Sequence, residues 1–418
     1  MTQLQPAKIA TSALVFTGIL LISLSLRSPI TGIGPLLDDI SQQLGISATQ
    51  AGMLTTLPLL AFALFSPIAS SMGKRFGLER SLMTSLVLIT LGLTLRSLGS
   101  TDMLFIGTTV IGAGIAIANV LLPSLTKRDF ADKAATVTSL YVLMMGVGSA
   151  IVASIAIPVA KWVDSQAINL LPNWALSLAT NLVFPLVAIL VWLPLMRSNK
   201  ISLRTQATHE RHGYVWRSSA AWHITLFLAL NSFLMYILIS WLPSILIDSG
   251  FSHEQAGVIH GVLQLATALP ALILIPLMAK VQDKRKLTLA LTSMALLGII
   301  GQIIAPMQAL WWALLMGFGI GGSFIIGLAL ISLRTANSYQ AATLSGMSQC
   351  IGYSFAATGP LIMGAMYQQS HDWRTPLLMC AGAAVLWAAC SFFAANGRLI
   401  SKPLESDTRL PPLKYHSE

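Results

Sequence analysis

The sequence predicts an all-α membrane protein with twelve spanning helices arranged as two bundles of six. Three observations lead to this fold class. The 418 residues are 55% hydrophobic and 10% charged, whereas about a quarter of the residues in an ordinary soluble domain are charged. Apolar segments long enough to cross a bilayer recur along the chain without strand-type alternation, so helices are the expected spanning element. The second half of the sequence also repeats motifs of the first.

Each predicted helix is an apolar segment of about 20 residues or more between polar turns. In chain order the segments are 9–37, 48–72, 79–99, 102–127, 133–162, 171–196, 218–249, 254–280, 285–304, 307–334, 339–368 and 373–396. The first segment follows Lys8 as a signal peptide would, but no small-x-small cleavage motif follows it. The stretch from Gly32 to Leu37 extends it to spanning length, so we interpret it as a retained helix.

Basic residues are concentrated in alternate turns. With the amino terminus inside, the inner turns and tails hold 21 Lys and Arg, whereas the outer side holds three, namely Arg96, Lys161 and Arg374. This asymmetry predicts a multi-pass protein of a bacterial inner membrane with both termini in the cytoplasm. The net charge of +10 is therefore an orientation signal, and no nucleic-acid partner is expected.

A long polar stretch divides the chain into two halves. We predict an N-terminal six-helix bundle at 1–195, a cytoplasmic linker loop at 196–219, a C-terminal six-helix bundle at 220–397 and a polar cytoplasmic tail at 398–418. The motif GISATQAG at 45–52 recurs 205 residues later as GFSHEQAG at 250–257, with five of eight positions identical. Because six is even, the two copies run parallel across the membrane. Such bundles face each other around a central path, as in the major facilitator fold.

Arg27 lies about 18 residues into the first predicted helix, with Ser23 and Thr31 four residues away on the same face. A charge at the centre of a membrane helix costs about 2.5 to 3.5 kcal/mol on insertion scales. We interpret Arg27 as the principal donor to a bound solute, with Thr31 beside it, because a guanidinium offers several donors and stays ionised. The alternative is that Arg27 extends to the headgroups or bonds backbone carbonyls near Pro29 and Gly32.

The fifteen acidic residues all fall in predicted turns, tails or helix ends. Arg27 therefore has no predicted carboxylate partner inside the membrane, unless Asp38 or Asp39 reaches back to it. For the same reason, the sequence predicts no buried carboxylate that could carry a coupling proton. The titratable candidate is His260, whose ordinary pKa near 6.5 suits a proton relay, and the alternative is an ordinarily solvated histidine near a helix end.

Neutral polar residues follow helical spacing on several predicted helices. Those expected to shape the pocket are Tyr236, Gln264, Gln349 and Tyr353. Serine and tyrosine often bridge neighbouring membrane helices, so a packing role stays open for each such stripe. Asn119 is followed by Pro123, and it either satisfies backbone freed by that proline or faces the pathway.

Other chemistry is not indicated. Cys350, Cys380 and Cys390 lie within predicted helices and lack metal-ligand spacing, so neither a disulfide framework, a metal nor a cofactor is expected. The glycine-rich stretch at 317–322 follows an apolar segment instead of a strand, which favours helix packing over a nucleotide loop. No HExxH, GxSxG or paired intramembrane Asp occurs, so we do not expect an enzyme.

Five strings together resemble one family of transporters. They are LRSPITGIGPLL at 26–37, ANVLLPSLTKRDF at 118–130, TSLYVLMMGVGSA at 138–150, SWLPSIL with GFSHEQAG at 240–257, and LSGMSQCIGYSFAATGP at 344–360. They resemble the cyanate and nitroimidazole transporters (CynX/NimT) of the major facilitator superfamily. The resemblance implies alternating access in a twelve-helix transporter for small polar or anionic solutes. It also implies family-typical positions for Arg27, Asn119, Tyr141, Gln349 and Tyr353.

One loop departs from the superfamily pattern. GKRFGLER at 73–80 has Lys74 where the superfamily usually has an acid. The inner-gate ion pair made by that acid is therefore in doubt, and the basic residues of the loop serve alternatively as orientation charges.

Together these features predict a secondary active transporter, active as a monomer in the lipid bilayer, that moves a small anionic or polar solute by alternating access. One alternative is a multidrug-type exporter of lipophilic compounds. A second alternative, of another class, is a membrane sensor that binds a solute without moving it.

Overall fold

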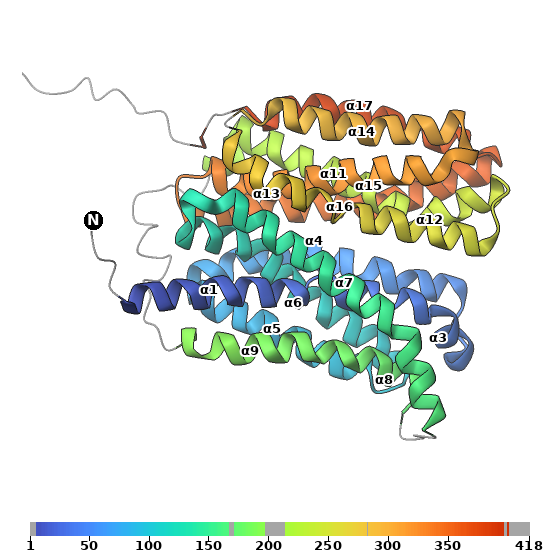
Figure 1. Ribbon diagram of the computed structural model, residues 1–418, viewed down its shortest axis with the longest axis horizontal. Helices are drawn as coiled ribbons and strands as arrows, with labels where there is room; N and C mark the ends of the chain where they lie inside the picture. Colours follow the sequence, from blue (N-terminus) through green and yellow to red (C-terminus); the bar gives the residue numbers. More distant parts are fainter. Residues whose placement is uncertain (1–5, 167–170, 197–213, 282, 397–398, 401–418) are drawn as a thin grey trace, which may run out of the picture.

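The computed structural model describes residues 6–166, 171–196, 214–281, 283–396 and 399–400, and the ordered elements in these ranges are helices (Figure 1). The helices before residue 197 are α1 (Pro6–Leu24), α2 (Ser28–Thr31), α3 (Leu37–Leu44), α4 (Ala48–Phe76), α5 (Leu78–Arg96), α6 (Thr101–Asp129), α7 (Ala134–Ser165), α8 (Asn173–Ala179) and α9 (Val183–Met196). The later helices are α10 (Tyr214–Arg217), α11 (Ser219–Asp248), α12 (His253–Ala266), α13 (Pro270–Lys280), α14 (Arg285–Ile304), α15 (Ala309–Arg334), α16 (Ser338–Ser370) and α17 (Arg374–Ala394).

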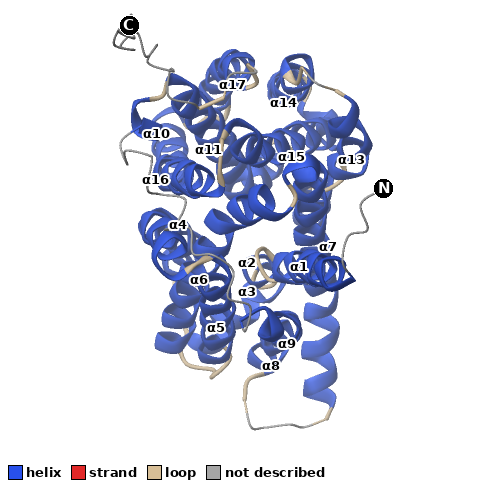
Figure 2. Ribbon diagram, turned by 90° about the vertical axis from the view of Figure 1, so that its left-hand side faces the viewer, coloured by secondary structure: helices blue, strands red, loops and turns tan. Residues whose placement is uncertain are grey.

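The helices form two groups. Helices α1 to α9 lie together in one half of the molecule, and α11 to α17 lie together in the other (Figures 1 and 2). The groups meet where α16 packs against α4 and α6, and where α7 packs against α13 and α15. The all-helical, two-bundle fold class predicted from the sequence is confirmed.

The repeated sequence motif starts a helix in each half. Ser47 caps α4 by accepting from the Gln50 N–H, and the Gln50 side chain accepts from the Ser47 N–H. Ser252 and Gln255 form the same reciprocal pair at the start of α12. The glycine two residues before each serine has a positive φ, which a residue without a Cβ adopts readily. The duplicated letters thus encode a turn followed by a capping box.

Eleven segments of the described residues are long and apolar enough to cross a membrane. The predicted helix at 339–368 is present as α16, which has 33 residues, but it is not among these eleven. It carries no charged residue and is rich in Ser, Gln, Gly and Tyr. The polar residues in its first half, such as Gln340, Ser345, Ser348 and Gln349, are buried where α16 packs against α4, α6 and α11, so they face protein.

Two predicted helices are broken at mid-length. The first predicted segment is interrupted at Ser25–Arg27 between α1 and α2, and the eighth is interrupted at Thr267–Leu269 between α12 and α13. Each break precedes a proline, Pro29 or Pro270, which has no N–H to donate to the carbonyl four residues earlier. The freed carbonyls belong to Ser25 and Ala266, at the edges of the breaks.

One end of the molecule carries basic residues of both groups, including Lys74, Arg128, Lys284 and Arg334, and we call it the basic end. The two groups are joined there. Ser332 Oγ of α15 donates to the Pro123 carbonyl of α6 over 2.8 Å. Lys74 Nζ of α4 lies 4.4 Å from the centre of the Tyr339 ring of α16.

The loop after α4 makes its ion pair within its own group. Arg128 Nη2 at the end of α6 donates to Glu79 Oε1 over 2.6 Å. Lys74, which replaces the acid usual in the superfamily, faces an aromatic ring of the opposite group. The contact between groups here is therefore a cation–π contact, which the sequence departure alone did not predict.

Candidate functional site

A cavity lies between the two groups at the level of the two helix breaks. It encloses about 770 Å³, part of which is open to solvent. Helices α4, α6, α7, α11, α15 and α16 and the two breaks contribute its walls. The lining residues are Leu26, Arg27, Ile30, Phe62, Asn119, Val142, Met145, Asn231, Ser232, Met235, Tyr236, Ile239, Thr267, Ile320, Gly321, Phe324 and Tyr353.

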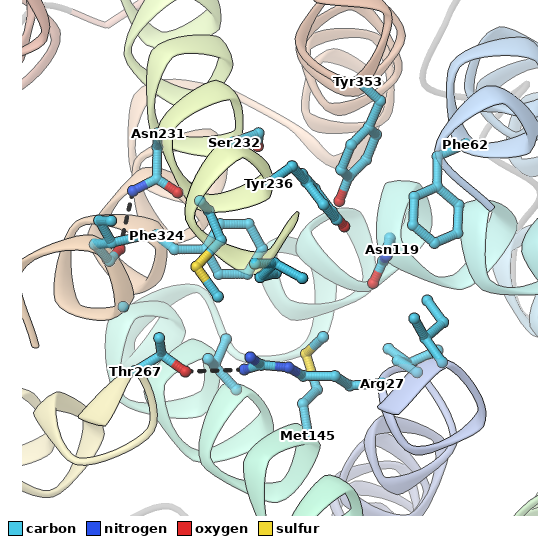
Figure 3. A pocket seen from close by; sticks show the side chains of 17 residues that line it. Arg27, Phe62, Asn119, Met145, Asn231, Ser232, Tyr236, Thr267, Phe324 and Tyr353 are labelled. Carbon is cyan, nitrogen blue, oxygen red and sulfur yellow. Dashed lines mark hydrogen bonds between the residues drawn. The ribbon is translucent and has the colours of Figure 1, made fainter. Parts of the chain in front are cut away.

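Arg27 extends across this cavity from one group to the other (Figure 3). Its Nη1 donates to Thr267 Oγ1 over 3.0 Å, and its Nη2 donates to Gln264 Oε1 over 3.2 Å. Both acceptors are neutral. The ion pairs found among the described residues involve Arg128 and Arg285, and none involves Arg27. A partly buried cation thus lies in the cavity without a carboxylate counter-charge.

The α1–α2 break directs Arg27 into the cavity. Thr31 Oγ1 and the Ser28 hydroxyl bond carbonyls of the broken turn, those of Arg27 and Leu24 respectively. Ser149 of α7 donates to Thr31 Oγ1 over 2.7 Å. These bonds replace part of the helical pattern that Pro29 interrupts, so the residue at the break is held although its turn is irregular.

Aromatic rings form the wall opposite Arg27. The Tyr353 ring centre lies 4.9 Å from that of Phe62 and 6.4 Å from that of Tyr236. Figure 3 shows the hydroxyl groups of both tyrosines on the side of the cavity where Asn119 lies. Together with Phe324 and the methionines at 145 and 235, the rings make most of the wall apolar.

A second, smaller cavity of about 330 Å³ adjoins the first and shares Asn119, Ser232, Phe324 and Tyr353 with it. Gln349 lines this second cavity. Its Nε2 donates to the Asn119 carbonyl over 2.8 Å and to Ser345 Oγ over 3.0 Å. Gln349 therefore joins α16 to α6 across the interface between the groups.

The residues singled out from the sequence divide into those at the cavities and those elsewhere. The structure brings Arg27, Asn119, Tyr236 and Tyr353 to the main cavity, Gln264 to the Arg27 guanidinium, and Gln349 to the second cavity. Gln264 reaches the guanidinium from outside both linings. The other three lie further away, namely Thr31, which bonds backbone behind Arg27, Tyr141, which is buried in α7, and His260, one turn before Gln264.

His260 Nε2 is buried and has no hydrogen-bond partner among the described residues. An N–H at this position would therefore have no hydrogen-bond acceptor among these residues in the present conformation.

Several lining residues escaped the sequence reasoning. Asn231 Nδ2 of α11 donates to the Ile320 carbonyl of α15 over 2.9 Å. Phe62, Phe324 and the two methionines carry no pattern that separates them from ordinary core residues. Thr267 reaches Arg27 because the helix is interrupted beside it, before Pro270.

Comparison with known proteins places these features in context. Residues 15–357 match the family model described as Major Facilitator Superfamily. The chain is 43% identical to the 2-nitroimidazole transporter of Escherichia coli (strain K12) over 387 residues, which cover 92% of this chain and 96% of that protein. It is 29% identical to the cyanate transport protein CynX of the same strain over 376 residues, covering 88% and 94%.

Solved structures with the same fold are distant in sequence. The crystal structure of the transporter FucP in its outward conformation superposes with a TM-score of 0.73 at 14% identity, covering 91% of this chain and 98% of that one. The proton:xylose symporter XylE bound to 6-bromo-6-deoxy-D-glucose gives 0.72 at 15% identity, covering 94% and 98%.

Proposed function

This chain belongs to the Major Facilitator Superfamily, and from that premise we propose that it moves a small planar solute with acceptor oxygens across the bacterial inner membrane by alternating access. The resemblance to the cyanate and nitroimidazole transporters, predicted from the sequence, is confirmed. The curated relatives named for an activity are transporters, not enzymes. The observation that carries the proposal is Arg27, a guanidinium held by neutral partners inside a largely apolar cavity.

The charge of Arg27 defines the group that the solute presents. A carboxylate or nitro group has two coplanar oxygens, which match the planar fork of a guanidinium. A hydrogen bond to a charged group contributes about 1.5–3 kcal/mol. An incoming anion adds an attraction between opposite charges that the neutral acceptors of Gln264 and Thr267 lack, so it would displace them.

The walls define the rest of the solute. Tyr353, Phe62 and Tyr236 present aromatic rings, and a flat ring stacks on such a surface with about 0.5–1.5 kcal/mol beyond the area it buries. Arg27, Phe62, Tyr236 and Tyr353 line the same cavity, so a single-ring compound there would meet both the guanidinium and the rings. We therefore favour an aromatic or heteroaromatic ring with one carboxylate or nitro substituent over a sugar, whose many hydroxyl groups would find few partners here.

The arrangement of contacts supports alternating access. The hydrogen bonds and ring contacts that join the groups in the described residues lie at the cavity or nearer the basic end. If the basic end is cytoplasmic, as the charge asymmetry indicates, both termini are cytoplasmic and this conformation is closed to the inside. In a monomeric transporter, rocking of the two bundles at 1–195 and 220–397 against each other would then open the inner side.

We propose His260 as the proton-coupling residue. It lies one turn from Gln264, which accepts from Arg27. Because no carboxylate lines either cavity of the described chain, a protonatable imidazole near the arginine is the available titrating group. Protonation there would favour arrival of an anion, since the second positive charge adds to that of Arg27.

The apolar wall also supports the alternative of an exporter for lipophilic compounds. Methionine and phenylalanine form adaptable surfaces that accept varied apolar ligands. Such an exporter would bind lipophilic cations and gain nothing from Arg27. A sensor, the alternative from another class, would bind a solute without passing it across the membrane.

A two-part experiment separates these functions. Thermal unfolding of the detergent-solubilised protein is followed with 4-hydroxybenzoate, 2-nitroimidazole, cyanate and the lipophilic cation tetraphenylphosphonium. Stabilisation by the first two, followed by their uptake into proteoliposomes, supports the transporter. Stabilisation by tetraphenylphosphonium alone supports the exporter, and stabilisation by a planar probe without uptake supports the sensor.

A further inference from the structure

A second arginine is buried in the membrane region. Arg96, the last residue of α5, is 1% exposed. Arg96 ends α5 far from the basic end, as expected for one of the three predicted outer charges, but it is buried instead of exposed to solvent. Its Nη1 donates to the Pro29 carbonyl over 2.5 Å, while its Nε and Nη2 are buried and have no hydrogen-bond partner among the described residues.

Plain packing does not account for a guanidinium at this place. Burying a charge without a counter-charge is costly, and a neutral amide would supply a donor to one carbonyl at lower cost. The backbone of Arg96 is held tightly, because Gly107 of α6 lets the two helices approach so closely that a Cβ there would meet the Arg96 backbone. The side chain is thus aimed at the Pro29 carbonyl from a rigid base.

The segment that Arg96 holds is the one that carries Arg27. Pro29 lies in α2, a helix of four residues directly after Arg27. One helical turn is not stable by itself, so the direction of α2 depends on outside contacts. On one side Ser149 of α7 bonds Thr31, and from α5 Arg96 bonds Pro29.

We propose that Arg96 is a positioning residue: by clamping the Pro29 carbonyl it fixes the α1–α2 break, and thereby points the Arg27 guanidinium into the cavity. The charge of Arg96 strengthens its hydrogen bond to this carbonyl. The inference rests on the proposed function in so far as Arg27 binds solute. The clamp itself is a property of the fold and can be tested without solute.

The first test measures hydrogen exchange of backbone amides in the full-length protein in detergent. Arg96→Met is expected to raise exchange in peptides covering 24–36 at least tenfold and to leave peptides covering 48–60 unchanged, because the α2 turn then opens locally. Arg96→Lys, which can still donate to the carbonyl, should restore most of the protection. Arg374→Met, a change at an exposed arginine on the same side, is the control. Unchanged exchange at 24–36 in Arg96→Met would overturn the proposal.

The second test asks whether the effect passes through Arg27. Affinity for 4-hydroxybenzoate is expected to fall at least tenfold in Arg96→Met and no more than about threefold in Arg96→Lys. In an Arg27→Met background, Arg96→Met should have little further effect, because coupled residues are not additive. Additive losses would mean that Arg96 acts elsewhere and would overturn the proposal. If the wild type binds no probe, the proposed function fails, while the exchange experiment still decides the clamp.

Discussion

Arg27 and Thr267 lie at two helix breaks that face each other across the cavity, with Arg27 Nη1 donating to Thr267 Oγ1 over 3.0 Å. The contact joins the two bundles and also occupies the guanidinium when no solute is bound. A solute that takes over this guanidinium therefore breaks a link between the bundles. Binding and rearrangement are coupled by the same pair of residues, provided that Arg27 is the solute's partner.

Removing the neutral competitor should tighten binding. In Gln264→Leu, Arg27 Nη2 loses the acceptor it now has at 3.2 Å, so a solute no longer displaces it. A hydrogen bond from a charged donor contributes about 1.5–3 kcal/mol, which predicts up to about 10-fold to 150-fold higher affinity for 4-hydroxybenzoate by isothermal titration calorimetry. Gln308→Leu, at an exposed position, is the control. Weaker binding in Gln264→Leu would mean that the amide contacts the solute directly.

Tyr353 should contribute to solute binding through its aromatic ring and not through its hydroxyl group. Tyr353→Ala removes the ring next to Phe62 and Tyr236, and we expect about tenfold or greater loss of affinity for 4-hydroxybenzoate. Tyr353→Phe should stay within about threefold of the wild type. Phe355→Ala, on the same helix but stacked on Phe233, controls for loss of an aromatic residue in α16. Equal losses in Tyr353→Phe and Tyr353→Ala would assign the binding to the hydroxyl instead.

Closure of the basic end should depend on a small residue in α16. A Cβ at Gly346 would lie 2.9 Å from the Cβ of Ser70 in α4, so Gly346→Leu should wedge these helices apart. Spin labels at positions 80 and 286, in a protein with Cys350, Cys380 and Cys390 replaced by serine, report the separation by double electron–electron resonance. In Gly346→Leu we expect most molecules to show a longer distance between the two labels than in the parent protein.

The control for this change is Gly382→Leu, because a Cβ at Gly382 meets no atom within 4 Å. It should leave the distance distribution of the parent protein unchanged. A distribution in Gly346→Leu that matches this control would show that the α4–α16 contact does not keep the basic end closed.

Proton coupling through His260 predicts a pH dependence of definite sign. If His260 binds the coupling proton, its protonated fraction grows as the outside pH falls, so uptake of 4-hydroxybenzoate into proteoliposomes should rise from pH 7.5 to pH 5.5. His260→Gln should abolish this rise, whereas His371→Gln, at an exposed position, should retain it. An unchanged rise in His260→Gln would remove His260 from the coupling.

The fold was predictable to a large extent because membrane helices are defined by local composition. The eight-residue repeat at 45–52 and 250–257 also carried a structural meaning, since Gly, Ser and Gln at fixed spacing form the same turn and capping box twice. Arg27 could be selected from the sequence because a charge inside an apolar segment is expensive. Each of these signals is local in the chain.

Features that depend on distant parts of the chain were less accessible. Proline occurs inside several helices that stay continuous, such as Pro58 in α4 and Pro123 in α6, so Pro29 and Pro270 did not by themselves predict breaks. The burial of Arg96 depends on the close approach of α5 and α6 and on a carbonyl 67 positions away in the chain. A residue at a helix end therefore looked like an exposed charge.

The measurement that tests the central claim most directly is the equilibrium binding of 4-hydroxybenzoate and 2-nitroimidazole to Arg27→Met, compared with Arg80→Met at an exposed arginine. Loss of hydrogen bonds from a charged donor of about 1.5–3 kcal/mol predicts about 10-fold to 150-fold weaker binding in Arg27→Met, the larger loss for the carboxylate, with Arg80→Met unchanged. Binding of both probes to Arg27→Met with wild-type affinity would contradict the assignment of Arg27 as the solute's partner.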